Sequence, residues 1–574
     1  MGCARPFLFL TKIINYTFAS PKPTHMNYKN YLTYLEEGIR NNWNCEALTN
    51  MGEETITYGQ LAERVEKLHI LFELCGIKPQ DKVAIYARNS INWAAAFIAT
   101  SSFEGTVVPL LNDFTPVSAT TLINHSDSAV LFTDPDKFRK LDAASMPEVR
   151  LVISLKDMSP LYNGIGETAQ AAFDGIEETF AARFPSFGPE DVRFPCDNFD
   201  KIALINYTSG TSSEPKGVML SYRNISSNMQ FGHDAVRNKA GDCLVSMLPL
   251  AHMYGLIWEL LYQLHGGSHV FFLGKVPSPR ILLNSFAQVK PYMMITVPLV
   301  IEKIFKNSVF PVVNKRYMKA LMNIPIASYI IRKRIRAKIM DAFGGNIRYM
   351  FIGGAAINAD VENWMKALRF PYSIGYGMTE CAPLIGYSAP DSYVKGTCGR
   401  IVDRMQIRVD SDDPEHIVGE LQVKGDNVMV GYFKNEEVTA AAFTDDGWMK
   451  TGDLGLIDEN GNICIKGRSK NMILSSNGQN IYPEEIEDKL NNQPYVVESV
   501  VVERDKKIVA LVYPDYDRVS QDSLDDNALA KLMDENRIKL NLLLPLYSQI
   551  SKIELRKEEF EKTPKRSIKR FKYK

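Results

Sequence analysis

Small hydroxylic residues and glycines gather just after a predicted strand in the first half of the chain. The stretch INYTSGTSSEPKGVMLSYRN (205–224) contains the residues best suited to contact phosphate, namely Thr208, Ser209, Gly210, Thr211 and Lys216. A loop of this composition can turn several backbone N–H groups and hydroxyls toward one point, which suits phosphate oxygens. It is not a Walker loop, because Lys216 precedes a glycine rather than Ser or Thr. Composition alone leaves an ordinary exposed loop as the alternative.

The residue order of this loop resembles the phosphate loop of the adenylate-forming superfamily, which includes acyl-CoA synthetases, luciferases and the adenylation domains of peptide synthetases. Ser213 departs from the family pattern, which usually has glycine there; if the position needs a positive φ, serine is modestly strained. Further stretches follow in the family's order: FIGGAAI (351–357), GYGMTE (375–380), DGWMKTGDLGLID (446–458) and IKGRSKNMI (465–473). The resemblance therefore extends from about residue 30 to residue 574.

The resemblance implies a site that binds ATP. The residues implied for adenine and the α-phosphate are Gly353, Gly354, Ala355, Tyr376, Gly377 and Thr379. Asp453 would accept from both ribose hydroxyls, because an ionised carboxylate has two acceptor oxygens, and Arg468 would contact the ribose as well. Glu380 would hold Mg²⁺, an ion that commonly binds one or two carboxylates together with substrate phosphates. Taken singly, Tyr376 is also consistent with a core tyrosine and Arg468 with a surface arginine.

The same resemblance places a hinge at Lys470, whose backbone would turn the C-terminal domain between two half-reactions. The next stretch, SSNGQNIYPEEIEDKL, would be used when the thioester forms, with Gly478 leaving room beside the pantetheine arm of CoA. Glu484 and Glu485 are better explained as the first turn of a helix that begins at Pro483. Acidic side chains there suit the positive end of the helix dipole.

The chain ends in EKTPKRSIKRFKYK, in which seven of fourteen residues are Lys or Arg. In the family, a catalytic lysine followed by Ile-x-Arg bridges the substrate carboxylate and the α-phosphate. Ile568 and Arg570 match that pattern, but Ser567 stands at the lysine position and cannot supply a positive charge. In an extended segment Lys565 and Lys569 point the same way as Ser567, although each lies about 6–7 Å along the strand. We predict that Lys569 is the substitute, with Lys565, or no substitute, as the alternatives.

His252, in LPLAHMYGL, aligns with the family residue at the carboxylate end of the acyl pocket. We expect it to orient or gate the substrate rather than act as a general base, because a fatty carboxylate is already ionised at neutral pH. The pocket itself would lie near His252, Val297–Leu299 and Ile374–Gly386, where side chains are mostly small or apolar. These residues do not indicate an acyl chain length.

Length and composition indicate a globular enzyme with more than one domain: 574 residues, 45% apolar, 23% charged, with a net charge of −1. From about residue 57 to 350, helical patterns alternate with short apolar strands such as KVAIYA, SAVLFTD and MMITVPLV, which is typical of parallel sheets buried on both faces. From about residue 398 the pattern changes to short strands with turn residues. The fold class is therefore predicted to be α/β.

The predicted N-terminal domain spans residues 26–469 and combines two parallel-sheet α/β subdomains with a small β-barrel-like subdomain. A small mobile α+β C-terminal domain spans residues 470–574. Residues 1–25 are predicted to be a disordered or non-native extension, with Met26 as an alternative start. Eight scattered cysteines without CxxC spacing argue against a disulfide framework or a zinc site, and no apolar run reaches the length of a membrane span.

The resemblance implies an AMP-forming fatty acid–CoA ligase for a long- or medium-chain acid, most similar to bacterial long-chain enzymes, that uses ATP, Mg²⁺ and CoA. A cytoplasmic location is expected, and both attachment to the inner membrane surface and a homodimer are left open. The balance of acidic and basic residues argues against nucleic acid as a partner. Two alternatives remain: transfer of the acyl group to an acyl carrier protein in trans, and a degenerate, non-catalytic member in which Ser567 marks the lost lysine.

Overall fold

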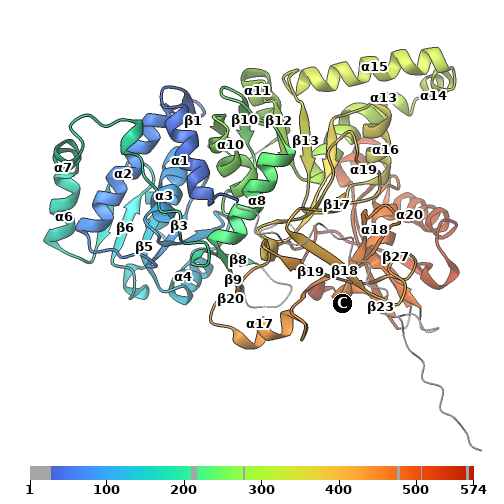
Figure 1. Cartoon of the computed structure of the whole chain (residues 1–574). Coiled ribbons are helices and arrows are strands. Elements are labelled where there is room, and N and C mark those ends of the chain that lie inside the picture. The colour runs from blue at the N-terminus through green and yellow to red at the C-terminus, as the bar shows by residue number, and fades with distance from the viewer. Residues whose placement is uncertain are drawn as a thin grey trace, which may run out of the picture.

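The structure is a computed structural model of the whole chain, and it describes residues 28–208, 216–275, 278–474, 479–505, 507–563 and 568–573. The side chains at positions 279 and 307 lie outside this set as well. Helix-covered sheets come first along the chain, antiparallel sheets follow, and a smaller region of strands and helices ends it (Figure 1). The predicted α/β fold class is confirmed.

A mixed eight-stranded sheet in the order β20-β9-β8-β4-β3-β5-β6-β7 forms the first α/β region. Its middle strands β8, β4, β3, β5 and β6 are parallel, whereas β7, β9 and β20 pair antiparallel at the edges. The strands are β3 Lys82–Tyr86, β4 Thr106–Leu110, β5 Ser128–Thr133, β6 Leu151–Ser154, β7 Pro160–Asn163, β8 Ile202–Thr208, β9 Lys216–Ser221 and β20 Gly431–Tyr432. Strands β4 and β5 are buried at every position, as expected for strands covered on both faces.

Helices cover this sheet and supply much of its core. Every residue of α3 is buried, and α3 packs on α2, β3 and β4. The helices of this part are α1 Tyr31–Asn41, α2 Tyr58–Leu74, α3 Ile91–Ser102, α4 Pro116–His125, α5 Pro135–Phe138, α6 Glu167–Asp174, α7 Ile176–Arg183 and α8 Tyr222–Ala235, with short 3-10 turns η1 Ala143–Ser145 and η2 Pro189–Asp191. Thr57 caps α2 through a capping box with Gln60, which explains where the helix begins.

The second α/β region contains two smaller sheets. Parallel strands β10 Cys243–Ser246, β11 His269–Phe272 and β1 Glu46–Asn50 pair side by side, with β2 Thr55–Thr57 antiparallel at the edge. A parallel sheet comprises β12 Met293–Thr296, β13 Tyr349–Ile352 and β14 Tyr372–Ile374. One predicted strand is too long: MMITVPLV ends as a strand at Thr296, and Pro298 opens a helix because proline fits the first helical turn.

The helices of the second region include two π-helical segments, η3 and η4. Helix α15 lies at the edge of the molecule, at the top of Figure 1. The bounds are α9 Met253–Gly255, η3 Leu256–Leu261, α10 Tyr262–His265, α11 Pro279–Val289, α12 Pro298–Ile304, η4 Phe305–Val309, α13 Phe310–Val313, α14 Arg316–Met322, α15 Pro325–Ala342 and α16 Ala359–Ala367. None of the helices that the structure describes has the length and apolar character of a bilayer span.

Two antiparallel sheets form the predicted barrel-like part. One contains β15 Tyr376–Gly377, β16 Leu384–Tyr387 and β17 Arg400–Ile401, and the 3-10 turn η5 Thr379–Cys381 lies between its first two strands. The other contains β18 Met405–Asp410, β19 Gly419–Gly425, β21 Met449–Ile457 and β22 Ile463–Arg468. Helix α17 Glu436–Ala442 follows β20.

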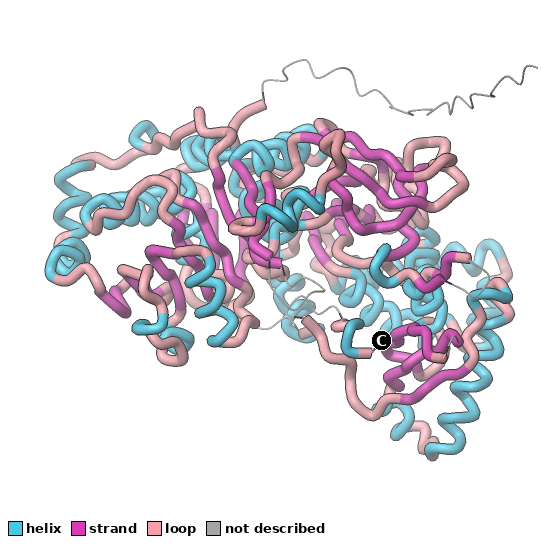
Figure 2. Tube along the Cα trace, turned by 90° about the horizontal axis from the view of Figure 1, so that it is seen from below, coloured by secondary structure: helices cyan, strands magenta, loops and turns pink. Residues whose placement is uncertain are grey.

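The C-terminal region has its own hydrophobic core and its own strands, which are seen as a group near the end of the chain in Figure 2. Strands β25 and β26 are antiparallel, and β27 pairs parallel to β26. The elements are η6 Ser469–Asn471, β23 Ile473–Leu474, β24 Asn480–Ile481, α18 Pro483–Asn491, β25 Val496–Arg504, β26 Lys507–Pro514, α19 Tyr516–Gln521, α20 Asp526–Asn541, η7 Leu546–Ser548, β27 Lys552–Leu555 and η8 Arg570–Lys572. The predicted helix start at Pro483, with two glutamates in its first turn, is confirmed.

Candidate active site

The two ends of the predicted phosphate loop are held together by strand pairing. Strands β8 and β9 are antiparallel, and Thr208 lies directly opposite Lys216. The residues between them, including Ser209, Gly210 and Thr211, lie outside the described residues, so their roles stay predictions. The ladder nevertheless fixes where the loop leaves and re-enters the sheet.

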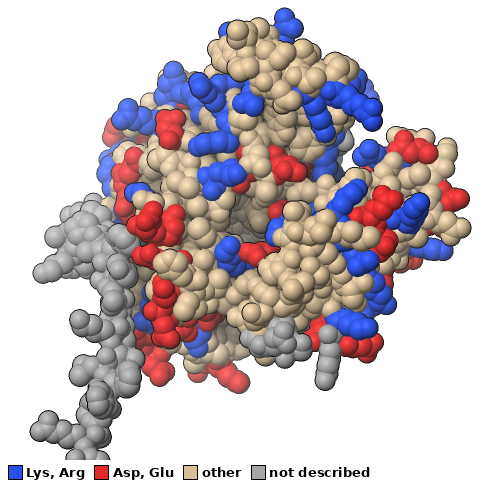
Figure 3. Space-filling view, turned by 90° about the vertical axis from the view of Figure 1, so that its right-hand side faces the viewer, with Lys and Arg blue, Asp and Glu red and all other residues tan. Residues whose placement is uncertain are grey.

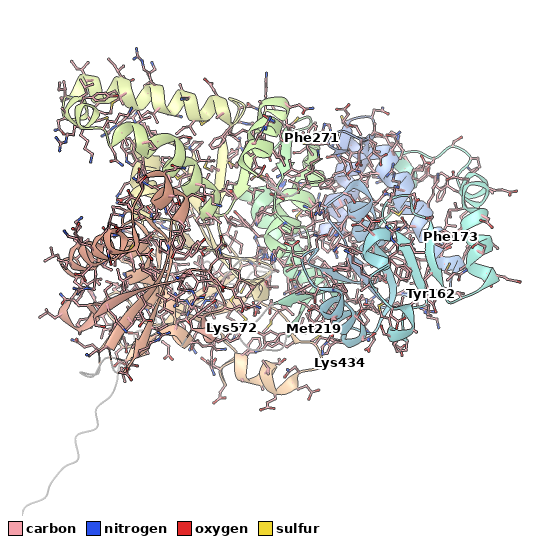
Figure 4. The ribbon with its side chains drawn as sticks, turned by 180° about the vertical axis from the view of Figure 1, so that it is seen from behind. Tyr162, Phe173, Met219, Phe271, Lys434 and Lys572 are labelled. Carbon is pink, nitrogen blue, oxygen red and sulfur yellow. The ribbon has the colours of Figure 1, made fainter. Side chains whose placement is uncertain are left out.

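Tyr432 joins the end of this loop to the predicted magnesium ligand. Strand β20 pairs with β9, and Figure 4 shows Met219 of β9 near Lys434, which follows β20. The ammonium of Lys216 lies 5.1 Å from the ring centroid of Tyr432, whose hydroxyl donates to Oε1 of Glu380 at 3.0 Å. Burial first, and then the charge of Glu380, raise the pKa of Tyr432, so its phenol stays a neutral donor.

Sequence reasoning missed Tyr432. The residue belongs to the stretch NVMVGYF, which reads as one more short strand, and an aromatic residue there is an ordinary core residue. Its hydroxyl partner is 52 positions earlier in the chain. Only the pairing of β20 with β9 brings it between Lys216 and Glu380.

Asp453 is the buried centre of the predicted ribose site. It lies opposite Arg468 on the neighbouring strands β21 and β22, and the Nε atom of Arg468 is 2.7 Å from its Oδ1. The Tyr376 hydroxyl donates to Oδ2 at 2.7 Å. Asp453 is only 3% exposed, and this burial raises its pKa, which Arg468 and the Tyr376 hydroxyl oppose. One carboxylate thus joins the GYGMTE motif to β22, the last strand before the predicted hinge.

Both carboxylate oxygens of Asp453 are engaged, yet each still has a second acceptor position. Hydrogen bonds from ribose hydroxyls are therefore compatible with the observed contacts. Gly377, next to Tyr376, has no space for a side chain, because a Cβ there would collide with the carbonyl of Pro383. The predicted adenine motif is consequently held tightly against the strand that follows it.

The predicted adenine loop, Gly353–Ala355, follows β13 directly. The Gly353 N–H donates to the Thr296 carbonyl at 3.1 Å, and a Cβ on Gly353 would lie 3.3 Å from the ring of Tyr254. Gly354 has φ +89°, a conformation that other residues rarely adopt. Gly354 and Ala355 are exposed, which leaves their backbone open to a ligand.

His252 immediately precedes α9, in a segment that polar side chains hold in place. Asn206 of β8 donates to the Ala251 carbonyl at 2.8 Å. Asn89 donates to the Leu248 carbonyl at 2.7 Å and accepts from the Leu250 N–H at 2.9 Å. The backbone that leads to His252 is therefore held against β8, and the role of the histidine stays a prediction.

Glu259 is a fully buried acid that sequence reasoning did not single out. It lies in the π-helical segment η3 and accepts hydrogen bonds from the Ser246 hydroxyl at 2.9 Å and from the Met247 and Leu248 N–H groups at 3.1 and 3.0 Å. Burial raises its pKa to about 8, against the three donors. The available signal was a lone acid in the apolar run GLIWELLYQL. Glu259 holds the start of the segment that carries His252.

Replacing Glu259 tests this positioning role. In Glu259→Ala the Met247 and Leu248 N–H groups lose their acceptor, so the free energy of unfolding should fall by about 2–5 kcal/mol. The folded-state pKa is above the unfolded value, so this carboxyl stabilises the protein fully below pH 4.5 and loses that effect as pH rises toward about 8. Glu259→Gln should flatten this decline, as measured by chemical denaturation from pH 4 to pH 9.

Glu558→Gln is the matched control, because Glu558 is exposed in the C-terminal region. It should leave both the stability and its pH dependence unchanged. A Glu259→Gln protein whose unfolding free energy followed the wild-type pH profile would contradict a raised pKa at this site.

The predicted hinge residue Lys470 lies in η6, directly after β22, between two contacts that join the neighbouring regions. Lys466 pairs with Glu485 at 3.2 Å, and the Asn471 amide donates to Glu484 at 2.6 Å. The first turn of α18 therefore packs against the strand that carries Arg468. Gly478 lies outside the described residues.

The basic tail is anchored to the C-terminal region. Arg570 forms an ion pair with Glu487 of α18, a buried carboxyl whose pKa burial raises to about 8 while Arg570 opposes the shift. Lys569, the predicted substitute for the family lysine, has its ammonium 3.5 Å from Oε2 of Glu561. Lys565 and Ser567 lie outside the described residues, so the choice between the two lysines stays a prediction.

The oxygen atoms available around Glu380 suit Mg²⁺. Among the residues that the structure describes, no group of three His, Cys, Asp or Glu side chains is close enough to hold a metal ion by itself. Glu380 offers one half-buried carboxylate, with Oε1 oriented by Tyr432. A single carboxylate beside a phosphate loop fits an ion that takes its other ligands from phosphates and water.

The chain matches two models of known families. Residues 35–433 match the AMP-binding enzyme family, and residues 470–573 match the AMP-binding enzyme C-terminal domain. The chain belongs to the AMP-binding enzyme family. The resemblance to the adenylate-forming superfamily is thereby confirmed, and so is the prediction of an AMP-forming acid–CoA ligase.

Curated members of the AMP-binding enzyme family resemble the chain over most of its length. Long-chain-fatty-acid–CoA ligase 1 of Homo sapiens is 28% identical over 497 residues, which cover 80% of this chain and 70% of that protein. Long chain acyl-CoA synthetase 7, peroxisomal, of Arabidopsis thaliana is 26% identical over 542 residues, which cover 88% and 76% of the two chains.

Solved structures of the AMP-binding enzyme fold superpose on nearly the whole chain. ATP-bound MatB from Rhodopseudomonas palustris has a TM-score of 0.74 at 22% identity and covers 95% of this chain and 98% of its own. The Mycobacterium tuberculosis fatty acyl CoA synthetase has a TM-score of 0.63 at 20% identity and covers 94% and 96%. At these identities the superpositions establish the fold.

Proposed function

We propose that this enzyme uses ATP to convert a fatty acid into an acyl-adenylate and then transfers the acyl group to CoA, with release of pyrophosphate and AMP. The observation that carries the proposal is the buried Asp453, which joins Tyr376 of the adenine motif to Arg468 at the hinge. The fatty acid as substrate is supported by the names of the curated relatives.

The first half-reaction makes the carboxylate reactive. A carboxylate is a poor electrophile because its leaving group would be oxide, and adenylation replaces this with AMP. One carboxylate oxygen attacks the α-phosphorus in line, the bond to the β-phosphate oxygen breaks, and pyrophosphate leaves. Catalysis is then mostly positioning and charge neutralisation. Lys216 and Thr208, at the ends of the phosphate loop, would contribute both.

Glu380 would hold Mg²⁺, which when bound neutralises phosphate charge and orients the phosphates. Tyr432 orients that carboxylate by donating to one of its oxygens, and its ring lies beside Lys216. Thr379, the residue before Glu380, would contact the α-phosphate. The residues proposed to contact the phosphates and Mg²⁺ thus lie along β8, β9, β20 and η5.

The second half-reaction requires a thiol to reach the acyl-adenylate. Rotation about Lys470 would move the C-terminal tail out of the active site and bring in the stretch that contains Gly478. Gly478 would then lie next to the pantetheine arm of CoA. The acyl chain would lie beyond His252 and the adenine loop, where a Cβ on Gly354 would be 3.9 Å from the side chain of Val297. The predicted acyl and adenine sites are therefore adjacent.

The test is an assay of both products. Purified protein receives ATP, Mg²⁺ and a panel of fatty acids from C8 to C18, with CoA, with holo acyl carrier protein or with neither. Pyrophosphate release together with acyl-CoA formation is the expected result. Thioester on the carrier protein alone would favour the carrier-protein alternative. Absence of pyrophosphate with every acid would contradict adenylation and favour a non-catalytic member.

The proposed role of Lys569 can be tested separately. Lys569→Ala should slow adenylation by about 10–100-fold, because a positive charge at the developing transition state is lost, while thioester formation from supplied acyl-AMP changes less than threefold. Pre-steady-state measurement of each half-reaction separates the two.

Lys572→Ala is the matched control, since Lys572 also pairs with Glu561 but lies three residues further along the chain. It should affect neither half-reaction. If Lys565→Ala rather than Lys569→Ala slows adenylation, the alternative lysine is the substitute. Equal loss of both half-reactions in Lys569→Ala would remove it from the proposed role.

A further inference from the structure

Besides the C-terminal tail, one surface segment of the chain is strongly basic. The chain as a whole has 66 basic and 67 acidic residues. The thirty residues from 311 to 340, which include α14 and most of α15, contain eight Lys or Arg and no Asp or Glu. None of them has a role in the proposed reaction.

The same segment exposes large apolar side chains. Ile326 of α15 is 76% exposed and Tyr329 is 64% exposed. Tyr317, which lies in α14, and Ile324, which lies just after it, are more than half exposed as well. Scattered apolar side chains are normal on a protein surface, but a cluster of them indicates a binding partner.

The exposed apolar side chains share one face of α15. At 100° per residue, Ile330 and Tyr329 lie within 60° of Ile326, whereas the buried residues Ser328 and Ile339 lie on the opposite side. The inner side packs against α11, and Figure 1 shows α15 at the outer edge of the molecule. The outward face of the first two turns is therefore apolar and uncovered among the described residues.

Basic side chains follow on the next turns of the same helix. Lys333 continues the outward face one turn after Tyr329 and Ile330, and the neighbouring basic residues are Arg332, Arg334, Arg336 and Lys338, all exposed. Figure 3 shows Lys and Arg side chains around tan side chains at the top of the molecule. An apolar end bordered by cations is the composition of helices that lie in the membrane interface.

We propose that α14 and α15 dock on an anionic lipid bilayer, with the apolar corner around Ile324 and Ile326 inserted and the basic turns against lipid head groups. A nucleic acid would need the cations but not the exposed isoleucines. A second copy of this face would bring two strongly basic surfaces together. Docking itself does not depend on the proposed function, although fatty acid dissolved in the bilayer would then be close to the enzyme.

The apolar contribution is tested by vesicle flotation in the absence of ATP and fatty acid. Wild-type protein should bind vesicles of phosphatidylcholine with 30% phosphatidylglycerol and should bind pure phosphatidylcholine at least tenfold more weakly. Ile326→Asp should weaken binding to the anionic vesicles about tenfold or more. Val117→Asp is the matched control, because Val117 is 77% exposed on α4, and it should bind like wild type.

The basic contribution is tested by Lys333→Glu together with Arg334→Glu. Each cation near an anionic surface contributes about 1 kcal/mol, so loss of two predicts at least about thirtyfold weaker binding. Lys78→Glu with Lys156→Glu, two exposed lysines of the first α/β region, should have little effect. Binding by wild type should also fall in 0.5 M salt.

Three results would overturn the proposal. The first is wild-type binding that does not differ between neutral and anionic vesicles. The second is undiminished binding by both the Ile326→Asp protein and the charge-reversed protein. The third is a wild-type dimer that becomes a monomer in Ile326→Asp without lipid, which would assign the surface to a second copy. Since these measurements contain no substrate, they are independent of the outcome of the activity assay.

Discussion

Asp453→Ala should lower kcat/KM for ATP by about 10²–10⁴-fold, since it removes the acceptor proposed for both ribose hydroxyls. It also leaves the buried Tyr376 hydroxyl without its partner and frees Arg468. The free energy of unfolding should therefore fall by about 1–3 kcal/mol. Initial rates over an ATP titration give kcat/KM, calorimetric titration gives the affinity for ATP, and chemical denaturation gives the free energy of unfolding.

Two variants separate charge from shape at this position. Asp453→Asn keeps the size of the side chain and can still accept from Tyr376, so it should retain most of the stability while ATP binding is weakened. Asp410→Ala, an exposed acid at the end of β18, should change neither quantity. Wild-type affinity for ATP in Asp453→Ala would contradict the ribose assignment.

Glu380→Gln should lower kcat for adenylation by about 10²–10³-fold and raise the Mg²⁺ concentration that gives half-maximal rate, because the amide carries no charge to hold the ion. Initial rates of pyrophosphate release over a magnesium titration provide both values. The fold should be unaffected, since the Tyr432 hydroxyl can donate to the amide oxygen in the same position.

Tyr432→Phe separates orientation of Glu380 from its charge. The ring stays beside Lys216, while the hydrogen bond to Glu380 is lost. The rate should fall only about 3–10-fold, with the larger change in the magnesium requirement. An effect of Tyr432→Phe as large as that of Glu380→Gln, at saturating magnesium, would show that Tyr432 does more than orient the carboxylate.

Several elements could be predicted from the sequence with the correct type. The strand KVAIYA and the helix at Pro483 are local patterns, and each is confirmed. MMITVPLV was predicted as one strand because its apolar residues continue without a break. The proline within it starts α12 instead. A run of eight residues is too short for hydrophobic periodicity to show where the strand ends and the helix begins.

Part of the candidate site could likewise be predicted from the sequence, and part could not. The motifs around Tyr376, Asp453 and Arg468 could be named from the sequence because their residue order resembles that of the adenylate-forming superfamily. Their mutual contacts could not be predicted, since Tyr376 and Asp453 are 77 positions apart. Tyr432 and Glu259 were not predicted at all, because each looks locally like an ordinary member of a strand or an apolar helix.

The sequence by itself therefore determined which side chains are available for the proposed chemistry: a hydroxyl-rich loop, one acid proposed for magnesium, one acid proposed for ribose, and a tail with serine where the family has lysine. Residue type and local order carry that information. Only the tertiary structure decided which groups meet, by pairing β20 with β9 and β21 with β22. It also decided that the apolar and basic side chains of α15 face outward, because burial depends on what packs against the opposite side of the helix.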